Sequence, residues 1–379
     1  MTYAEVSNWA RAQIPTFREK AQSFEDLRYL PSDTAKEMAS AGLFRLLTPE
    51  YLGGLEVTPA EFSEILQLVS QGDASAGWCT MIADTAALVG AYLPEETARD
   101  VFSDPDVILA GIFAPMGKAV QDGKNYIVNG TWQWASGSMN CDWLSGGALI
   151  MEDGNPRLLP NGMPDSRMMI FSRSVVELID TWHVAGLKGT GSGDMSVSNV
   201  AVPVERSVSL LIDKPVVESP LYVFPVFGLL ALGIASVAIG NARAALDTVK
   251  ELAKGKAAPG GRKTLVDRPV VQTEIAKAEA TLRSARAFLA ESVDQAWRAA
   301  QTTDTLSADT RADLRLSCTH ATRVCADVCR VAYDLGGGSS VFLSNELQRR
   351  FRDAHTMTQH IMVSPAIYEQ TGRIKLDLN

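Results

Sequence analysis

The sequence is poor in the residues that build metal sites and disulfide frameworks. It has only four histidines and five cysteines among 379 residues, and no HxH or HExxH spacing. The histidines therefore predict no metal site. Because the cysteines are odd in number and scattered, they predict reduced thiols and a cytoplasmic location. A nucleophile elbow and a strand followed by GxGxxG are also missing, which argues against a hydrolase of that type and against a Rossmann nicotinamide site.

Positive charge and long apolar runs are scarce as well. Acidic residues outnumber Lys and Arg by 44 to 35, and the net charge of −9 gives no support for nucleic acid as a partner. The N-terminus lacks the charged-then-apolar pattern of a signal peptide. The longest uncharged apolar run, Val226 to Gly240, holds three glycines and is too short to cross a bilayer. It predicts a buried bundle helix, and no membrane is expected as a partner.

What is present fits a globular chain with a sizeable core. Hydrophobic residues make up 46% of the sequence and charged residues 21%, which distinguishes it from a disordered chain. Its length allows two or three packed layers.

Residues 1–107 carry the signals of a helical domain. Thr58 is a candidate N-cap with Pro59 at the first helical position. Pro31-Ser32 and Pro94 offer two further helix starts, and Gly42 offers a stop.

Residues 108–213 have the texture of strands. Tyr126–Val128 and Trp132–Trp134 are predicted as strands around an Asn129-Gly130 turn. Short β-rich runs follow at 168–171, 175–178 and 197–202. This block predicts a small β-barrel or sandwich domain.

Residues 214–379 predict a helical bundle domain. Two apolar seams alternate spacings of three and four, as antiparallel bundle helices require. The seams are Ile275, Ala278, Leu282, Ala285, Leu289, Val293, Ala296 and Leu314, Cys318, Ala321, Cys325, Val328, Ala332, Leu335. The fold class is therefore α+β, with helices, then a barrel, then a bundle.

The stretch from Tyr333 to His360 contains the first specific motif. Three glycines, Gly336, Gly337 and Gly338, form an elbow that lets a backbone approach a phosphate or flat ring closely. A segment with an Arg352-Asp353 pair follows, and we expect it to be helical as far as His360. This order resembles the flavin-binding C-terminal bundle of the acyl-CoA dehydrogenase superfamily. The resemblance implies flavin contacts from the three glycines.

A second motif, WHVAGLKGTGSGDM, begins at Trp182 and is followed by a strand that ends at Pro203. It resembles the "W…GLRGTGS…VP" segment of the flavin-dependent monooxygenase branch of that superfamily. This branch includes oxygenase components of 4-hydroxyphenylacetate hydroxylase, dibenzothiophene monooxygenase and indole oxygenases. A structural loop would need the glycines but not the two hydroxyls between them. The resemblance therefore implies that Thr190 and Ser192 bind the flavin.

A third motif, WQWASGS, starts at Trp132, where dehydrogenases of this superfamily carry a strand against the flavin. By this resemblance Trp134 would lie beside the ring, and Ser136 and Ser138 would bind the cofactor. Ser136 is also predicted as catalytic, because a short hydroxyl is needed at the N5–C4a edge of the flavin. The alternative interpretation is an ordinary barrel strand with exposed serines.

Four aromatic residues are candidates for the substrate pocket: Trp78, Phe113, Phe224 and Phe227. Each could equally be a core residue. His360 lies seven residues after Asp353, a spacing similar to that of a flavin-facing histidine in the monooxygenase branch. It is predicted as catalytic, with a pKa near its ordinary value of about 6.5. The alternative is a satisfied histidine of the bundle.

The resemblance covers essentially the whole chain and implies a group D, two-component flavin monooxygenase. Such an enzyme would take reduced flavin, FADH2 or FMNH2, from a separate NAD(P)H-dependent reductase. With O2 it would hydroxylate a small aromatic or heteroaromatic substrate similar to a phenol or an indole. The resemblance also implies a homotetramer, in which Arg262 reaches the flavin phosphate of a neighbouring subunit.

Two alternatives stay open at this stage. An acyl-CoA dehydrogenase with bound FAD would need a carboxylate base, but the segment from His355 to Ile361 has none. Glu346 precedes the Arg-Asp pair and is expected to face solvent. A non-catalytic flavoprotein of the same fold is the second alternative. The sequence distinguishes neither FAD from FMN nor one substrate from another.

Overall fold

A computed structural model describes residues 1–210, 212–256 and 264–378. Its first third is helical, as expected. The helices are α1 Tyr3–Leu27, α2 Ser32–Ser40, α3 Pro59–Gly72, α4 Ala74–Ala87 and α5 Glu95–Val101. The predicted N-cap Thr58 is confirmed, since it forms a capping box with Glu61 at α3. Asp73, which was not predicted as a cap, accepts from the Ala76 backbone N–H at α4.

The strands form one twisted sheet in the order β6-β7-β2-β1-β3-β5-β8, with β4 paired to β3. Their bounds are β1 Leu109–Asp122, β2 Asn125–Trp132, β3 Trp143–Glu152, β4 Asn155–Pro156, β5 Ser166–Ser172, β6 Glu177–Ile179, β7 Asp194–Pro203 and β8 Ser207–Val208. The predicted turn at Asn129-Gly130 is wrong. Both residues lie inside β2, and the register with β7 shifts between Val128 and Gly130 because β7 has one extra residue there, at the left-handed Asn199 (φ 53°).

Trp132 is the centre of the sheet's core. Its indole is fully buried and donates to the carbonyl of Gly147 at 2.7 Å. A Cβ at Gly117, Gly130 or Gly146 would lie 2.4–2.6 Å from this ring. These strand glycines therefore provide the space that the tryptophan fills.

The last third is a bundle of long helices. Its members are α6 Pro220–Val223, α7 Val226–Gly255, α8 Pro269–Ala300, α9 Ala308–Gly336, α10 Glu346–Met357 and α11 Ala366–Lys375. Both predicted seams face inward, with only their end residues Ile275 and Leu335 partly exposed. The apolar run at 226–240 is the start of α7. By length and composition α7 could cross a membrane, but 94% of its most apolar window is buried inside the protein.

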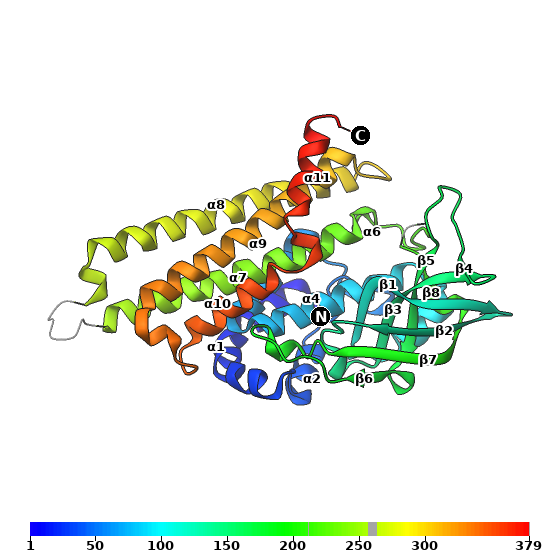
Figure 1. Cartoon of the computed structure of the whole chain (residues 1–379), viewed down its shortest axis with the longest axis horizontal. Coiled ribbons are helices and arrows are strands. Elements are labelled where there is room, and N and C mark those ends of the chain that lie inside the picture. Colours follow the sequence, from blue (N-terminus) through cyan, green and yellow to red (C-terminus); the bar gives the residue numbers. More distant parts are fainter. Residues whose placement is uncertain (211, 257–263, 379) are drawn as a thin grey trace.

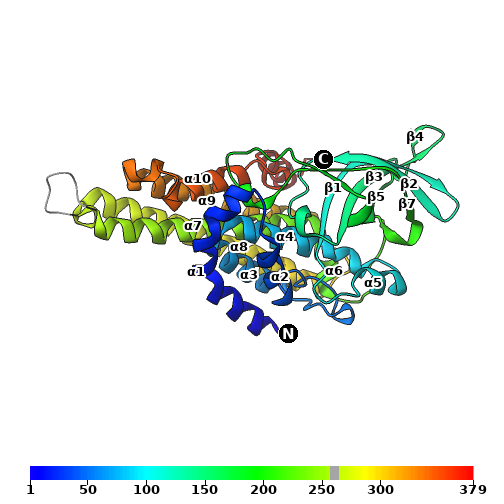
Figure 2. The same cartoon turned by 90° about the horizontal axis from the view of Figure 1, so that it is seen from below.

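The sheet lies at one end of the molecule and the long bundle helices extend from the other (Figure 1). Helix α4 packs against both β1 and α7, so it joins the two parts. The view from below shows α4 at this junction (Figure 2). The α+β fold class is confirmed by the matching architecture of solved structures. The domain boundaries at 107 and 213 stay a prediction.

Candidate active site

Three hydroxyl groups form a buried chain between β2 and β7. Ser136 Oγ lies 2.6 Å from Ser192 Oγ, which lies 2.6 Å from Thr190 Oγ1. Thr190 donates to the Leu187 carbonyl at 2.8 Å, and the Trp78 indole N–H donates to Ser136 Oγ at 3.2 Å. The two ends fix the direction, because an indole N–H only donates and a carbonyl only accepts.

Each hydroxyl in this chain therefore donates toward Leu187 and accepts from the side of Trp78. Ser136 gives its proton to Ser192 and receives one from Trp78, which leaves one lone pair on its oxygen. The chain offers an acceptor, rather than a donor, to any ligand at Ser136. Ser136 and Ser192, which were both predicted to bind the flavin, are thus in direct contact, whereas no motif linked Trp78 to them.

The loop that carries Thr190 and Ser192 is anchored on the bundle. Leu187 has a left-handed backbone, φ 53°, and its N–H donates to Asp353 Oδ1 at 2.6 Å. The Trp182 indole also donates to the Leu187 carbonyl. Burial, followed by the negative charge of Asp73, raises the pKa of Asp353 to about 7. The Asp of the Arg-Asp motif thus holds the glycine-rich loop in place.

Trp134 has a strained backbone conformation and an exposed side chain. The φ angle of Trp134 is 69°, which lies in the left-handed region that bulky residues rarely adopt, and 64% of the residue is exposed. The prediction of a strand over Trp132–Trp134 is therefore wrong beyond Trp132. An exposed indole on a left-handed residue suggests a functional constraint, because such strain costs on the order of 1–3 kcal/mol. Its ring is free to lie against a flat ligand.

His360 lies on the other side of Trp78. The two ring centroids are 5.8 Å apart in an edge-to-face arrangement. Helix α10 ends at Met357, so the expected helix that carries His360 is wrong; the residue instead begins the short 3-10 helix Ile361–Val363. His360 Nδ1 accepts from the Met362 backbone N–H at 3.2 Å. The proton of the neutral ring is thereby assigned to Nε2.

The pKa of His360 departs from the expected value near 6.5. Burial, followed by the positive charge of Arg315, lowers it to about 4. The side chain is therefore neutral at neutral pH, and its Nε2–H is a hydrogen-bond donor. His360 suits the role of a neutral donor better than that of a base.

The predicted pocket phenylalanines lie in two different environments. Phe113 of β1 and Phe227 of α7 are half-buried, with ring centroids 6.0 Å apart. Phe224 is buried in the core, where its ring and the Leu314 side chain both approach Gly228. Phe113 and Phe227 are thus the better placed of the three to meet a ligand.

The glycine elbow lies apart from these residues. Gly336–Gly338 connect α9 to α10 at the end of the long helices remote from the sheet (Figure 1). Lys256 Nζ donates to the Gly336 carbonyl at 2.7 Å and to Ser339 Oγ at 2.8 Å. Within one chain the elbow therefore does not join Ser136. Arg262 lies outside the described residues.

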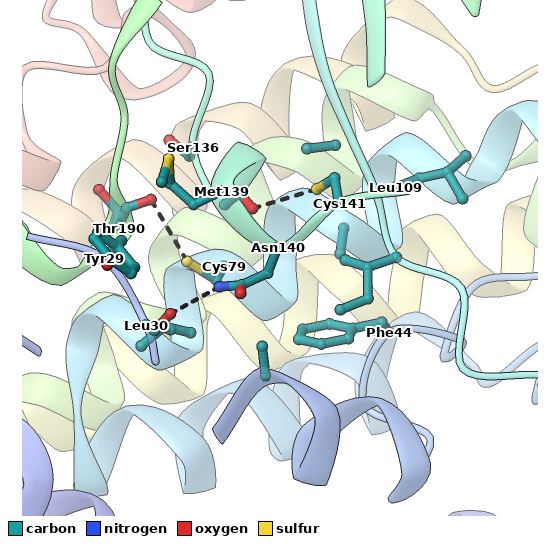
Figure 3. A pocket seen from close by; sticks show the side chains of 15 residues that line it. Tyr29, Leu30, Phe44, Cys79, Leu109, Ser136, Met139, Asn140, Cys141 and Thr190 are labelled. Atoms are coloured by element: carbon teal, nitrogen blue, oxygen red, sulfur yellow. Dashed lines mark hydrogen bonds between the residues drawn. The ribbon is translucent and has the colours of Figure 1, made fainter. Parts of the chain in front are cut away.

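A small enclosed space lies behind Ser136 (Figure 3). It has a volume of about 10 Å³, which holds about one water molecule. Its lining includes Cys79, Asn140 and Thr190, and the buried Ser138 lies in the adjoining turn. This space is too small for an aromatic substrate. Because Ser138 is buried in the turn, its position is typical of a residue that stabilises the turn.

Among the described residues, no carboxylate of the acyl-CoA dehydrogenase kind acts on His360. Glu346 was expected to face solvent, and that expectation is wrong: it is mostly buried and bonded to Arg18 and Thr248. Burial alone would raise its pKa, but the charge of Arg350 and these hydrogen bonds lower it to about 2. In the described part of the chain, no group of three or more His, Cys, Asp or Glu side chains could hold a metal ion.

Known proteins share this architecture. The family model for the acyl-CoA dehydrogenase C-terminal domain matches residues 232–365. The indole-3-acetate monooxygenase of Pseudomonas putida is 35% identical over 357 residues, which cover 94% of this chain and 89% of that protein. The protein of the same name from Acinetobacter baumannii is 32% identical, over 95% and 91% of the two chains.

Solved structures agree over the full length. The HsaA monooxygenase from M. tuberculosis superposes with a TM-score of 0.89 at 27% identity, covering 100% of this chain and 98% of that one. These relatives are named monooxygenases rather than dehydrogenases. The segment from His355 to Ile361, which lacks the carboxylate base of a dehydrogenase, agrees with those names. The chain therefore belongs to the flavin-dependent monooxygenases of the acyl-CoA dehydrogenase superfamily.

Proposed function

We propose that this protein is the oxygenase component of a two-component monooxygenase that hydroxylates a small aromatic substrate, with an indole-like compound as the first candidate. Two relatives are named indole-3-acetate monooxygenase, and a third, from a Rhizobium strain, is named an FADH2-dependent resorcinol hydroxylase, oxygenase component. The reaction balances as Ar–H + O2 + reduced flavin giving Ar–OH + H2O + oxidised flavin. The reduced flavin, when bound, supplies the two electrons that activate O2.

One observation carries this proposal: the hydrogen-bond chain ends in a free acceptor on Ser136, two residues after the exposed Trp134. A reduced flavin has an N–H at N5, whereas the oxidised ring has only a lone pair there. The acceptor on Ser136 therefore fits the reduced form. Trp134 is exposed and able to cover one face of a flat ring.

The other residues of the site bind, orient and exclude water. Trp78, Phe113 and Phe227 provide apolar contact for a planar substrate. His360, neutral and with its proton on Nε2, would donate a hydrogen bond to oxygen held between flavin and substrate. These aromatic side chains also keep the site dry, which protects a reactive oxygen from water.

The direct test is turnover with a generic flavin reductase that supplies reduced FMN or FAD. We expect O2-dependent hydroxylation of at least one member of a panel of indole, phenol and resorcinol. We also expect little flavin after purification and tighter binding of the reduced form. Bleaching of bound FAD by an acyl-CoA under anaerobic conditions, without any aromatic product, would overturn the proposal.

We further propose a homotetramer and a separate NAD(P)H-dependent reductase as partners. The elbow is followed by three exposed apolar residues, Val341, Phe342 and Leu343, which a neighbouring subunit would cover. In such an assembly the elbow of one subunit would approach the flavin of another, which is the arrangement that the roles predicted for Gly336–Gly338 and Arg262 require. A cytoplasmic location is supported by five free cysteines.

A further inference from the structure

Arg315 carries a positive charge with no partner of opposite charge. Its Nη2 donates to the Met362 carbonyl at 2.9 Å. Its Nε is buried and has no acceptor among the described residues, and no ion pair formed there includes Arg315. Burial lowers the pKa of its guanidinium, so the charge is held at a cost. Arg315 is half-buried, and a charged group that is partly withdrawn from water in this way normally has a counter-charge.

Arg315 is fixed next to His360. Both side chains bond to the same residue, Met362: the imidazole accepts from its N–H and the guanidinium donates to its carbonyl. The charge of Arg315 is strong enough at His360 to lower the pKa of that ring. His360 in turn meets Trp78, which bonds to Ser136. Arg315 is therefore connected to the proposed active site through His360 and Trp78.

Two ionisable groups near Arg315 could carry a negative charge among the described residues, but neither neutralises the guanidinium. Asp313, two residues before it on α9, pairs with Lys375 at 2.9 Å. The ionisable group that acts on the guanidinium is the Cys318 thiol. Burial raises the pKa of that thiol to about 12, so it is neutral. None of the described residues therefore supplies a negative charge to Arg315, and a bound ligand is able to supply one.

We propose that Arg315 binds a carboxylate on the substrate, so that the enzyme selects aromatic acids with a short acidic arm over neutral aromatics. This inference rests on the proposed function and specifies its substrate class. A guanidinium presents two parallel N–H groups that match the two oxygens of a carboxylate. The relatives named for indole-3-acetate act, by those names, on a compound with an acid one carbon from the ring.

The test compares indole-3-acetate with indole-3-acetamide, a neutral compound of the same shape, using reduced flavin and the wild-type protein. We expect kcat/KM to favour the acid by at least about tenfold. In Arg315→Gln the preference should vanish through a rise in KM for the acid, by about tenfold or more, while KM for the amide changes little. Arg315→Lys should keep part of the preference, because it keeps the charge but loses the paired N–H groups.

Arg323→Gln is the matched control, since it removes one positive charge from the same helix about two turns away. It should leave the acid preference intact. Equal losses for acid and amide in Arg315→Gln would mean a structural role, and weaker binding of reduced flavin with unchanged substrate KM would mean a phosphate contact; either result overturns the inference. Hydroxylation of neutral indole in the same assay shows that such a failure does not extend to the proposed function.

Discussion

At the residue scale, the site depends on which atoms donate and which accept. Trp78 and Leu187 fix the two ends of the hydroxyl chain, and Met362 fixes the tautomer of His360. Neither property follows from residue type alone, because serine and neutral histidine can each donate and accept. The surrounding backbone therefore decides what each side chain offers to a ligand.

Replacing His360 with Ala is expected to uncouple the reaction. Without the Nε2–H donor, reduced flavin should still consume O2 but release H2O2, and hydroxylation should fall by about 10²-fold. Product and H2O2 measured together give the coupling ratio. His355→Ala is the control, because His355 packs on the Phe351 ring with centroids 4.4 Å apart and belongs to another surface. Full coupling in His360→Ala would contradict the assignment.

Replacing Thr190 with Val should change which form of flavin binds. The substitution keeps the shape of the side chain and removes the hydroxyl that fixes the direction of the chain. Ser136 would then be able to turn and donate to the oxidised ring. The ratio of Kd for oxidised flavin to Kd for reduced flavin should fall by about 2–10-fold, equivalent to one hydrogen bond of about 0.5–1.5 kcal/mol.

The matched control for that experiment is Thr131→Val, an exposed position on β2. Anaerobic fluorescence titration of each variant with reduced and oxidised flavin gives both constants. An unchanged ratio in Thr190→Val would mean that the hydroxyl chain does not select the redox form.

At the scale of elements, a loop of the sheet domain is positioned by a helix of the bundle. Asp353 of α10 receives the Leu187 N–H, and a Cβ at Gly186 would collide with the Arg352 carbonyl at 2.4 Å. The glycine thus permits the contact and the carboxyl secures it. Any motion of α10 relative to the sheet would be transmitted to Thr190 and Ser192.

Asp353 should make stability depend on pH around neutrality. Its pKa is raised in the folded state to about 7, against about 3.9 in an unfolded chain. Its contribution to the free energy of unfolding is therefore present in full at low pH and is lost as the pH rises through 7. Asp353→Asn still accepts the Leu187 N–H and should flatten the difference between pH 6 and pH 8.5 in urea unfolding.

Asp353→Ala should instead lower the free energy of unfolding at every pH, by about 1–3 kcal/mol, because the buried Leu187 N–H loses its acceptor. The charged groups around Asp353 are Asp73, Glu25 and Arg349. Equal pH dependence in the wild type and Asp353→Asn would show that these neighbours, rather than Asp353, determine it.

Most of these helices and strands could be predicted from the sequence, but few of the contacts between them could. Helix starts at Thr58 and the two bundle seams were predictable, because capping and periodicity are local properties. The continuation of β2 through Asn129-Gly130 was missed, since Asn-Gly is also a strong turn signal. Nothing in the sequence marked Arg315 as a site residue, because a charged residue next to an apolar seam is usually exposed. Only the packed structure shows that its buried Nε has no acceptor among the described residues.

At the scale of the whole molecule, the motif residues fall into two groups that one chain does not bring together. Trp134, Ser136 and the glycine-rich loop lie at the sheet, while the glycine elbow lies at the far end of the bundle (Figure 1). The sequence resemblance assigned both groups to one cofactor. The proposed symmetric assembly would resolve this separation if the elbow of a second copy approached the sheet of the first.

The assembly is therefore expected to depend on the apolar residues after the elbow. Phe342 is 64% exposed in the single chain, between Val341 and Leu343, which are exposed to a similar degree. Phe342→Asp would bury a charge in the interface, so light scattering at micromolar concentration should show a shift from tetramer toward smaller species. Flavin affinity should fall with it, since each site would lose the elbow of its neighbour. Leu158→Asp is the control, because Leu158 is 63% exposed in the loop after β4. A wild-type protein that is monomeric by mass, yet binds reduced flavin tightly, would show that the elbow has no part in the cofactor site.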